Sequence, residues 1–137
     1  MSDTATLFTN VSIFDGTGAA TFYGQVLVRG DRIARVARLG EPMDREVARV
    51  IDGRGATLMP GLVEAHAHLT WPSSVERVVN AMKLPVEEHM LVTAQNARIT
   101  LDYGFTSAYS AGSLGERFEV ALRDMINAGH KIGRAHV

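Results

Sequence analysis

The chain has 137 residues, a formal net charge of −1, 46% hydrophobic residues and no cysteine. This length suits one ordinary domain, and the near-neutral charge gives no electrostatic reason to expect a nucleic-acid partner or an anionic membrane surface. The absence of cysteine excludes disulfides and thiolate metal sites. No apolar run approaches the ~18 residues of a membrane span, and no signal peptide is visible, so we expect a cytoplasmic protein.

Short strands are predicted in the first part of the chain, because apolar, β-branched runs alternate with glycine-containing turns. These runs cover residues 5–14, 26–29, 33–36, 47–51 and 56–59. Gly30-Asp31 separates the second run from the third, which predicts a β-hairpin. We therefore expect a β-rich part over residues 1–57.

The pattern changes after Pro60-Gly61, where the next run is the nearly continuous apolar "LVEAHAHL". Such a run predicts a strand that is buried on both faces. A helix is predicted to begin at Pro85 and to end at Gly104. The side of this helix that we expect to be buried carries Val86, Met90, Ala94, Ala97 and Leu101.

A second strand is predicted at "FTSAYSAG", followed by a second helix at "GERFEVALRDMINAG" that Gly129 ends. Phe118, Leu122 and Met125 share one side of this helix. The order strand, helix, strand, helix predicts a parallel α/β unit over residues 58–131.

Two histidines, His66 and His68, lie at the end of the predicted buried strand and precede the break "TWPSS". Residues i and i+2 of a strand share a face, so the two imidazoles project side by side. At this spacing they can bind one metal ion at ~2.1 Å each. We predict that they are metal ligands, with packing or surface positions as the alternative, and we expect Trp71 near the mouth of the same pocket.

The ordered set of hairpin, "DGRGATLMPG" and H-x-H resembles the amidohydrolase superfamily, the metal-dependent hydrolases that include imidazolonepropionase-like enzymes and Xaa-Pro dipeptidases. The β-sandwich part that opens these proteins is similar to "LFTNVSIFDGTGAATFYGQVLVRGDRIARV". The first barrel helix and second strand are similar to "ARITLDYGFTSAYSAG". Glu64 departs from the pattern, which more often has aspartate there, and "SAYSAG" lacks an arginine-aspartate pair that many relatives carry.

The resemblance implies an α/β fold in which residues 1–57 form part of a composite β-sandwich and residues 58–131 begin a TIM-type (β/α)8 barrel. It implies hydrolysis of carbon–nitrogen bonds in a small-molecule amide or cyclic amide, with one or two divalent ions, zinc being the expected metal. Such an ion lowers the pKa of bound water towards ~7 and polarises the scissile carbonyl. A homo-oligomer is compatible with the intact enzyme.

The remaining ligands of such a site have no candidates in the chain. The resemblance implies a lysine from the fourth strand, histidines from the fifth and sixth, and an aspartate from the eighth that acts as general base. A barrel needs about 250 residues, whereas roughly 80 follow Thr57. We expect half a site, no activity from this chain alone, and low stability, aggregation or dependence on a partner chain.

The last six residues, "IGRAHV" at 132–137, match the translation of one frame of a common sequencing adapter, and Lys131 fits the codon that precedes it. We expect this tail to be adapter read-through, which the flanking nucleotide sequence would test. His136 then belongs to the tail. His130 is predicted to be a solvated loop residue, and His89 a surface or helix-packing residue.

Two other classes of function stay open from the sequence. The chain could be a non-catalytic β-rich interaction module in which the histidines form a structural or intersubunit metal site. It could also be a domain without metal, which metal analysis would distinguish.

Overall fold

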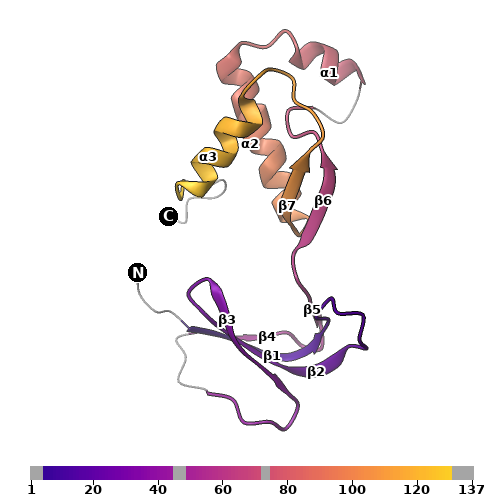
Figure 1. Cartoon of the computed structure of the whole chain (residues 1–137), viewed down its shortest axis with the longest axis vertical. Helices are drawn as coiled ribbons and strands as arrows, with labels where there is room; N and C mark the ends of the chain where they lie inside the picture. Colours follow the sequence, from indigo (N-terminus) through magenta and orange to yellow (C-terminus); the bar gives the residue numbers. More distant parts are fainter. Residues whose placement is uncertain (1–4, 45–48, 72–74, 131–137) are drawn as a thin grey trace. The chain divides into compact units, whose positions relative to one another are not determined.

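A computed structural model describes residues 5–44, 49–71 and 75–130. The chain divides into two units, Met1–Pro60 and Gly61–Val137 (Figure 1). The described part of the first unit contains strands and no helix, whereas the second combines strands with helices. The fold is therefore mixed α/β, as expected. None of the described helices is long and apolar enough to cross a membrane.

The first unit is one sheet with β1 at its centre. Its strands are β1 (Ala5–Ile13), β2 (Phe22–Arg29), β3 (Arg32–Arg38), β4 (Arg49–Asp52) and β5 (Thr57–Leu58). The order is β3-β2-β1-β4, and β5 also pairs with β1. The first three strands are antiparallel, and the predicted hairpin at Gly30-Asp31 is confirmed, whereas β4 and β5 run parallel to β1.

A bulge divides β1 into two halves. Phe8 pairs with Val26 while Val11 pairs with Gly24, so two residues of β1 lie opposite one residue of β2. Asn10 occupies the bulge with a φ of 52°. An extra residue in a strand of side-chain period two transfers the following side chains to the other face of the sheet.

The core of the first unit consequently has two apolar clusters. Ala5 and Leu7 cluster with Leu27, whereas Val11 and Ile13 cluster with Val26. Val26 and Leu27 are neighbours in β2 and therefore point to opposite faces. The bulge thus allows β1 to contribute apolar side chains to both faces of the sheet.

The turn between β4 and β5 is built against this bulge. The backbone N–H of Arg54 and the side-chain amide of Asn10 both donate to Asp52 Oδ1, at 2.9 and 3.1 Å. These bonds, the backbone one first, hold the pKa of Asp52 below its usual value. A Cβ at Gly53 would overlap Val11. The "DGRG" segment is therefore fixed by close contact with β1.

The second unit contains a parallel strand pair and helices. Its elements are β6 (Leu62–Ala67), α1 (Val75–Ala81), α2 (Val86–Asp102), β7 (Phe105–Ser110) and α3 (Phe118–Asn127). β6 and β7 are parallel, as predicted, and α2 contacts both β7 and α3 (Figure 1). Helix α1 was not predicted, because it is too short to show a helical period over the 11–18 residues that such a pattern requires.

The predicted ends of α2 are confirmed. Pro85 is its N-cap residue, and Glu87 and Glu88 lie in the first turn, where acidic side chains interact favourably with the positive end of the helix. Gly104 follows the C-cap with a φ of 91°. This left-handed conformation favours glycine and ends the helix there.

The expected burial of β6 on both faces is wrong. Val63 is 65% exposed and Leu62 is 41% exposed. The reason is that β6 pairs with β7 alone among the described strands. A strand in a two-stranded sheet has one paired edge and few neighbours to cover its faces.

The expected apolar side of α2 is also not the side that is most buried. Val86 is 67% exposed, while the buried residues of α2 are His89 and Thr93. His89 is therefore a helix-packing residue, one of the two positions predicted for it. On α3, Leu122 is buried as expected, whereas Met125 is 47% exposed.

Replacing Leu7, which is 1% exposed, tests the core of the first unit. We expect Leu7→Ala to lower the free energy of unfolding by about 2–5 kcal/mol, because it removes buried methyl groups and leaves a cavity. Leu39→Ala is the matched control, because Leu39 is 78% exposed; its effect should stay within about 0.5 kcal/mol. Urea unfolding followed by far-UV circular dichroism measures both, and equal effects would contradict the assignment of Leu7 to the core.

Candidate metal centre

The imidazole rings of His66 and His68 lie next to each other at the carboxyl end of β6. Their centroids are 5.1 Å apart and their planes are inclined by 77°. His66 is exposed and His68 is half-buried. The expected juxtaposition of the two rings is therefore present, with one face of the pair open to solvent.

A hydrogen bond to the neighbouring strand orients His68. Its Nδ1 lies 2.9 Å from the backbone oxygen of Gly112, which follows β7. A carbonyl oxygen can only accept, so Nδ1 carries a proton, and in the neutral ring Nε2 then has the free lone pair. Gly112 has a φ of 145°, and a Cβ there would contact the His68 ring at 3.5 Å. The space beside the ring would accept a Cβ, so it is the positive φ of Gly112 that favours glycine at this position.

Trp71 forms the other side of the His68 environment. The two rings are stacked, with centroids 4.2 Å apart and planes inclined by 16°. Trp71 is 41% exposed. Both histidines and Trp71 line an open hollow of about 800 Å³ that α1 and α2 also border. The tryptophan thus lies at the same hollow as the histidines, as expected from the sequence.

Glu64, where related motifs more often have aspartate, is directed back to the strand. Its Oε1 accepts a hydrogen bond of 3.1 Å from the backbone N–H of His66. The carboxylate therefore supports the backbone of one histidine, and it also lines the hollow.

A third ligand is not found next to the pair. Within residues 5–44, 49–71 and 75–130, no group of three or more His, Cys, Asp or Glu side chains is placed to hold a metal ion. His89 is buried, with Nε2 3.1 Å from the backbone oxygen of Thr70. His130 is exposed and follows α3. His136 lies outside the described residues, as does the predicted read-through tail.

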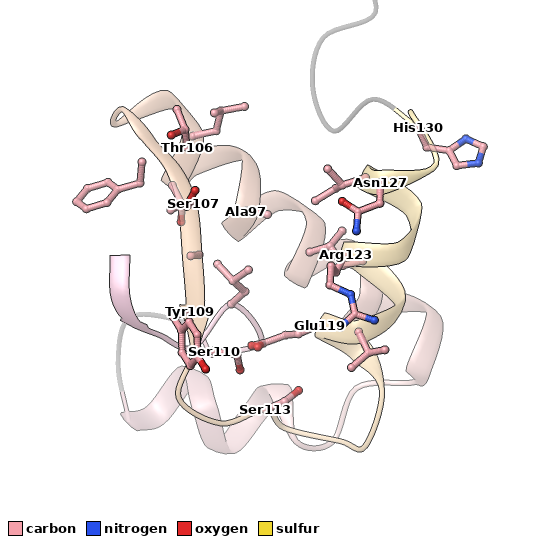
Figure 2. Close-up of a pocket in the computed structure, with 18 of the residues that line it drawn as sticks. Ala97, Thr106, Ser107, Tyr109, Ser110, Ser113, Glu119, Arg123, Asn127 and His130 are labelled. Carbon is pink, nitrogen blue, oxygen red and sulfur yellow. The ribbon is translucent and has the colours of Figure 1, made fainter. Parts of the chain in front are cut away.

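A second hollow, of about 750 Å³, lies between β7 and α3 and does not include either histidine of the pair. Figure 2 shows side chains of β7, among them Tyr109 and Ser110, on one side of it and Arg123 and Asn127 of α3 on the other. Glu119 extends from α3 into this hollow (Figure 2). The hollow adjoins β7, whose only paired neighbour among the described strands is β6.

Two parts of this arrangement were not predicted from the sequence. Gly112 is 44 residues from His68, and no local pattern connects the two residues. The hydrogen bond between His89 of α2 and the Thr70 carbonyl likewise joins residues that are 19 positions apart in the chain. A polar residue within an amphipathic helix pattern was the only signal for His89, and it does not specify a partner.

No protein-family model matches the chain. It is similar to curated proteins, among them one that it matches over most of its own length. The relative is an imidazolonepropionase from Treponema denticola, which is 30% identical over 132 residues. The alignment covers 90% of this chain and 32% of the relative.

Solved structures also share the fold, among them the following two. One is an amidohydrolase, with 26% identity and a TM-score of 0.75. The other is a prolidase in complex with N-methylphosphonate-L-proline, with 25% identity and a TM-score of 0.74. Each alignment covers 92% of this chain and 29% of the solved chain. The chain therefore spans about a third of the length of each of these three proteins.

The bond to Gly112 predicts the tautomer of His68. We expect long-range ¹H–¹⁵N correlation spectra to show His68 protonated on Nδ1, because that nitrogen faces a carbonyl oxygen at 2.9 Å. His89 is the internal comparison: its Nε2 faces the Thr70 carbonyl, so it should be protonated on Nε2. An Nε2-protonated His68 would contradict the orientation described here.

Proposed function

Because this chain belongs to the amidohydrolase superfamily, we propose that it is part of a metal-dependent hydrolase that cleaves carbon–nitrogen bonds of amide or cyclic-amide type. The observation that carries this proposal is the juxtaposition of the His66 and His68 rings, with centroids 5.1 Å apart. Two imidazoles on one side of a strand end are suited to share one divalent ion.

The residues present fit two ligand positions of such an ion. Nδ1 of His68 is engaged by Gly112, so Nε2 is the atom that would bind the metal. A histidine ligand commonly donates its other ring N–H to a carbonyl, which fixes the ring and raises its basicity. Zinc is the metal we propose, since it accepts nitrogen ligands readily.

When bound, a divalent ion would supply polarisation of the scissile carbonyl and a nucleophilic water at neutral pH. The protein's own contribution is orientation. Gly112 holds the His68 ring in one tautomer, Trp71 covers one face of that ring, and Glu64 fixes the backbone at His66. The open hollow of about 800 Å³ beside them offers room for a small-molecule substrate.

We further propose that residues 58–131 begin a (β/α)8 barrel and that residues 1–57 contribute to a composite β-sandwich. The parallel pair β6–β7, with α2 between them in the chain and α3 after them, supports the first statement. The likeness to the solved amidohydrolase over 92% of the chain supports both. In this architecture, the strands and ligands that follow β7 complete the site.

This proposal includes inactivity of the 137-residue chain by itself. A catalytic zinc commonly has three protein ligands and an open position, whereas the described residues bring two candidates together. The general base and the substrate contacts would come from the parts of a complete enzyme that have no counterpart here.

Zinc titration of the 137-residue chain tests the histidine pair. We expect isothermal titration calorimetry to show Zn²⁺ binding that His66→Ala and His68→Ala each weaken by more than about 100-fold, since loss of a ligand should exceed the 10–100-fold cost of losing its supporting contacts. His130→Ala is the control, because His130 is exposed and does not line the hollow of the pair; it should leave the affinity unchanged.

The same titration distinguishes the proposed metal site from the two alternatives, a domain without metal and a module with an intersubunit metal site. Equal zinc affinity in the parent chain and both alanine variants would contradict a metal site at this pair. Zinc-dependent dimerisation in sedimentation experiments, lost with the same two variants, would instead favour an intersubunit site in a non-catalytic module.

A chimera tests the reaction class. We expect the chain, joined to the remaining two-thirds of the imidazolonepropionase from Treponema denticola, to hydrolyse a carbon–nitrogen bond. His66→Ala should then lower kcat/KM by more than about 100-fold, for the same reason as above. His130→Ala again serves as control. Full activity and normal metal content in the His66→Ala chimera would refute the ligand role.

A further inference from the structure

Thr70 lies two residues after His68, and it joins three separate segments of the second unit. It is fully buried, at 0% exposure. Its hydroxyl oxygen accepts a hydrogen bond of 2.8 Å from the backbone N–H of Leu114, and its own N–H donates to Glu119 Oε1 at 3.2 Å. Its carbonyl oxygen accepts from His89 Nε2 at 3.1 Å. All three polar groups of Thr70 are therefore satisfied, each by a different element or loop.

The side chains of α2 hold the backbone around Thr70. Asn96 Nδ2 donates to the carbonyl oxygens of Leu69 and Trp71, at 2.8 and 3.4 Å. His89 and Asn96 are seven residues apart, so they lie on the same side of α2. This side of the helix thus satisfies three consecutive carbonyl groups of the loop that follows His68.

The same contacts connect the two loops that orient His68. One loop carries Trp71, whose ring stacks on His68 and whose N–H donates to the His68 carbonyl at 2.9 Å. The other carries Gly112, which accepts from His68 Nδ1. The bond from Leu114 to Thr70 joins this second loop to the first. The backbone bond from Ala111 N–H to the Ala67 carbonyl, at 2.8 Å, holds the starts of the two loops together, and Thr70 joins them further along the chain.

Burying so many polar groups carries a free-energy cost, which suggests that they have a positioning role. A buried polar group is destabilising when it lacks a partner. In this cluster Glu119 Oε2 is buried with no hydrogen-bond partner among the described residues. Apolar side chains at Thr70 and His89 could fill the same space without such a requirement, but they could not fix backbone carbonyl and N–H groups.

We propose that Thr70, together with His89 and Asn96, positions His68 for metal binding. The cluster holds the Trp71 loop and the Gly112 loop at the separation that lets His68 Nδ1 reach the Gly112 carbonyl, and so keeps Nε2 available. This inference rests on the proposed metal site. Thr70 and His89 do not line the hollow of the histidine pair, whereas Asn96 does. All three would act on the ion through His68, so we class them as positioning residues.

Zinc affinity of Thr70 variants of the 137-residue chain tests this role. We expect Thr70→Val, which keeps the side-chain shape but loses the acceptor for Leu114, to weaken Zn²⁺ binding by about 10–100-fold, the usual effect of removing a contact that supports a ligand. Thr70→Ser keeps the hydroxyl and should restore most of the affinity. The emission of Trp71, the only tryptophan of the chain, should shift in Thr70→Val and not in Thr70→Ser.

Thr93→Val is the matched control. Thr93 is also 0% exposed, but its hydroxyl donates to the His89 carbonyl within α2, at 2.9 Å. Its replacement should lower the unfolding temperature while leaving zinc affinity and Trp71 emission unchanged. Should Thr70→Val fail to fold, Asn96→Ala takes its place, because Asn96 is only half-buried. This variant should also weaken zinc binding.

The outcomes distinguish the two proposals. If the parent chain binds zinc through the histidine pair and Thr70→Val or Asn96→Ala binds it equally well, the positioning role is overturned and the metal site stands. If Thr93→Val weakens zinc binding as much as Thr70→Val does, the effect belongs to general stability and the positioning role is likewise overturned. If the parent binds no zinc, or binds it equally without either histidine, both proposals fail.

Discussion

The parallel pairing of β6 with β7 is the constraint on which the candidate metal centre depends. Ala67 pairs with Ser110 at the carboxyl ends of the two strands, so the loops that follow them leave the sheet at the same edge. This brings the ring of His68 to the carbonyl of Gly112 across 44 residues of sequence. A shift in register would remove the acceptor, even though the two histidines would remain neighbours.

The parts of the fold that could be predicted are those that local chemistry determines. Glycine with positive φ at the hairpin and Gly104 after α2 mark where elements end, and both were predictable from single residues. The adjacency of His66 and His68 follows from the two-residue period of a strand. The orientation of His68 was not predictable, because it depends on Gly112, which only the tertiary structure brings near.

Burial was predicted less well, because it depends on what covers an element. Every buried residue described in the first unit is apolar, whereas the second unit buries Thr70, His89 and Thr93. An apolar pattern on a helix indicates a buried side only when an apolar neighbour is present. Here α2 faces the backbone of a loop, whose carbonyl groups require donors, and the polar side of the helix supplies them.

The parallel attachment of β4 and β5 to β1 has a kinetic consequence. Thr6 pairs with Arg49 and Ile13 with Leu58, closing loops of roughly 40–45 residues, whereas β1, β2 and β3 are joined by short connections. Contacts of high sequence separation form late, because closing a long loop is entropically unfavourable. The three-stranded meander can assemble on a nascent chain first, and the other edge of β1 is completed only after β4 and then β5 have left the ribosome.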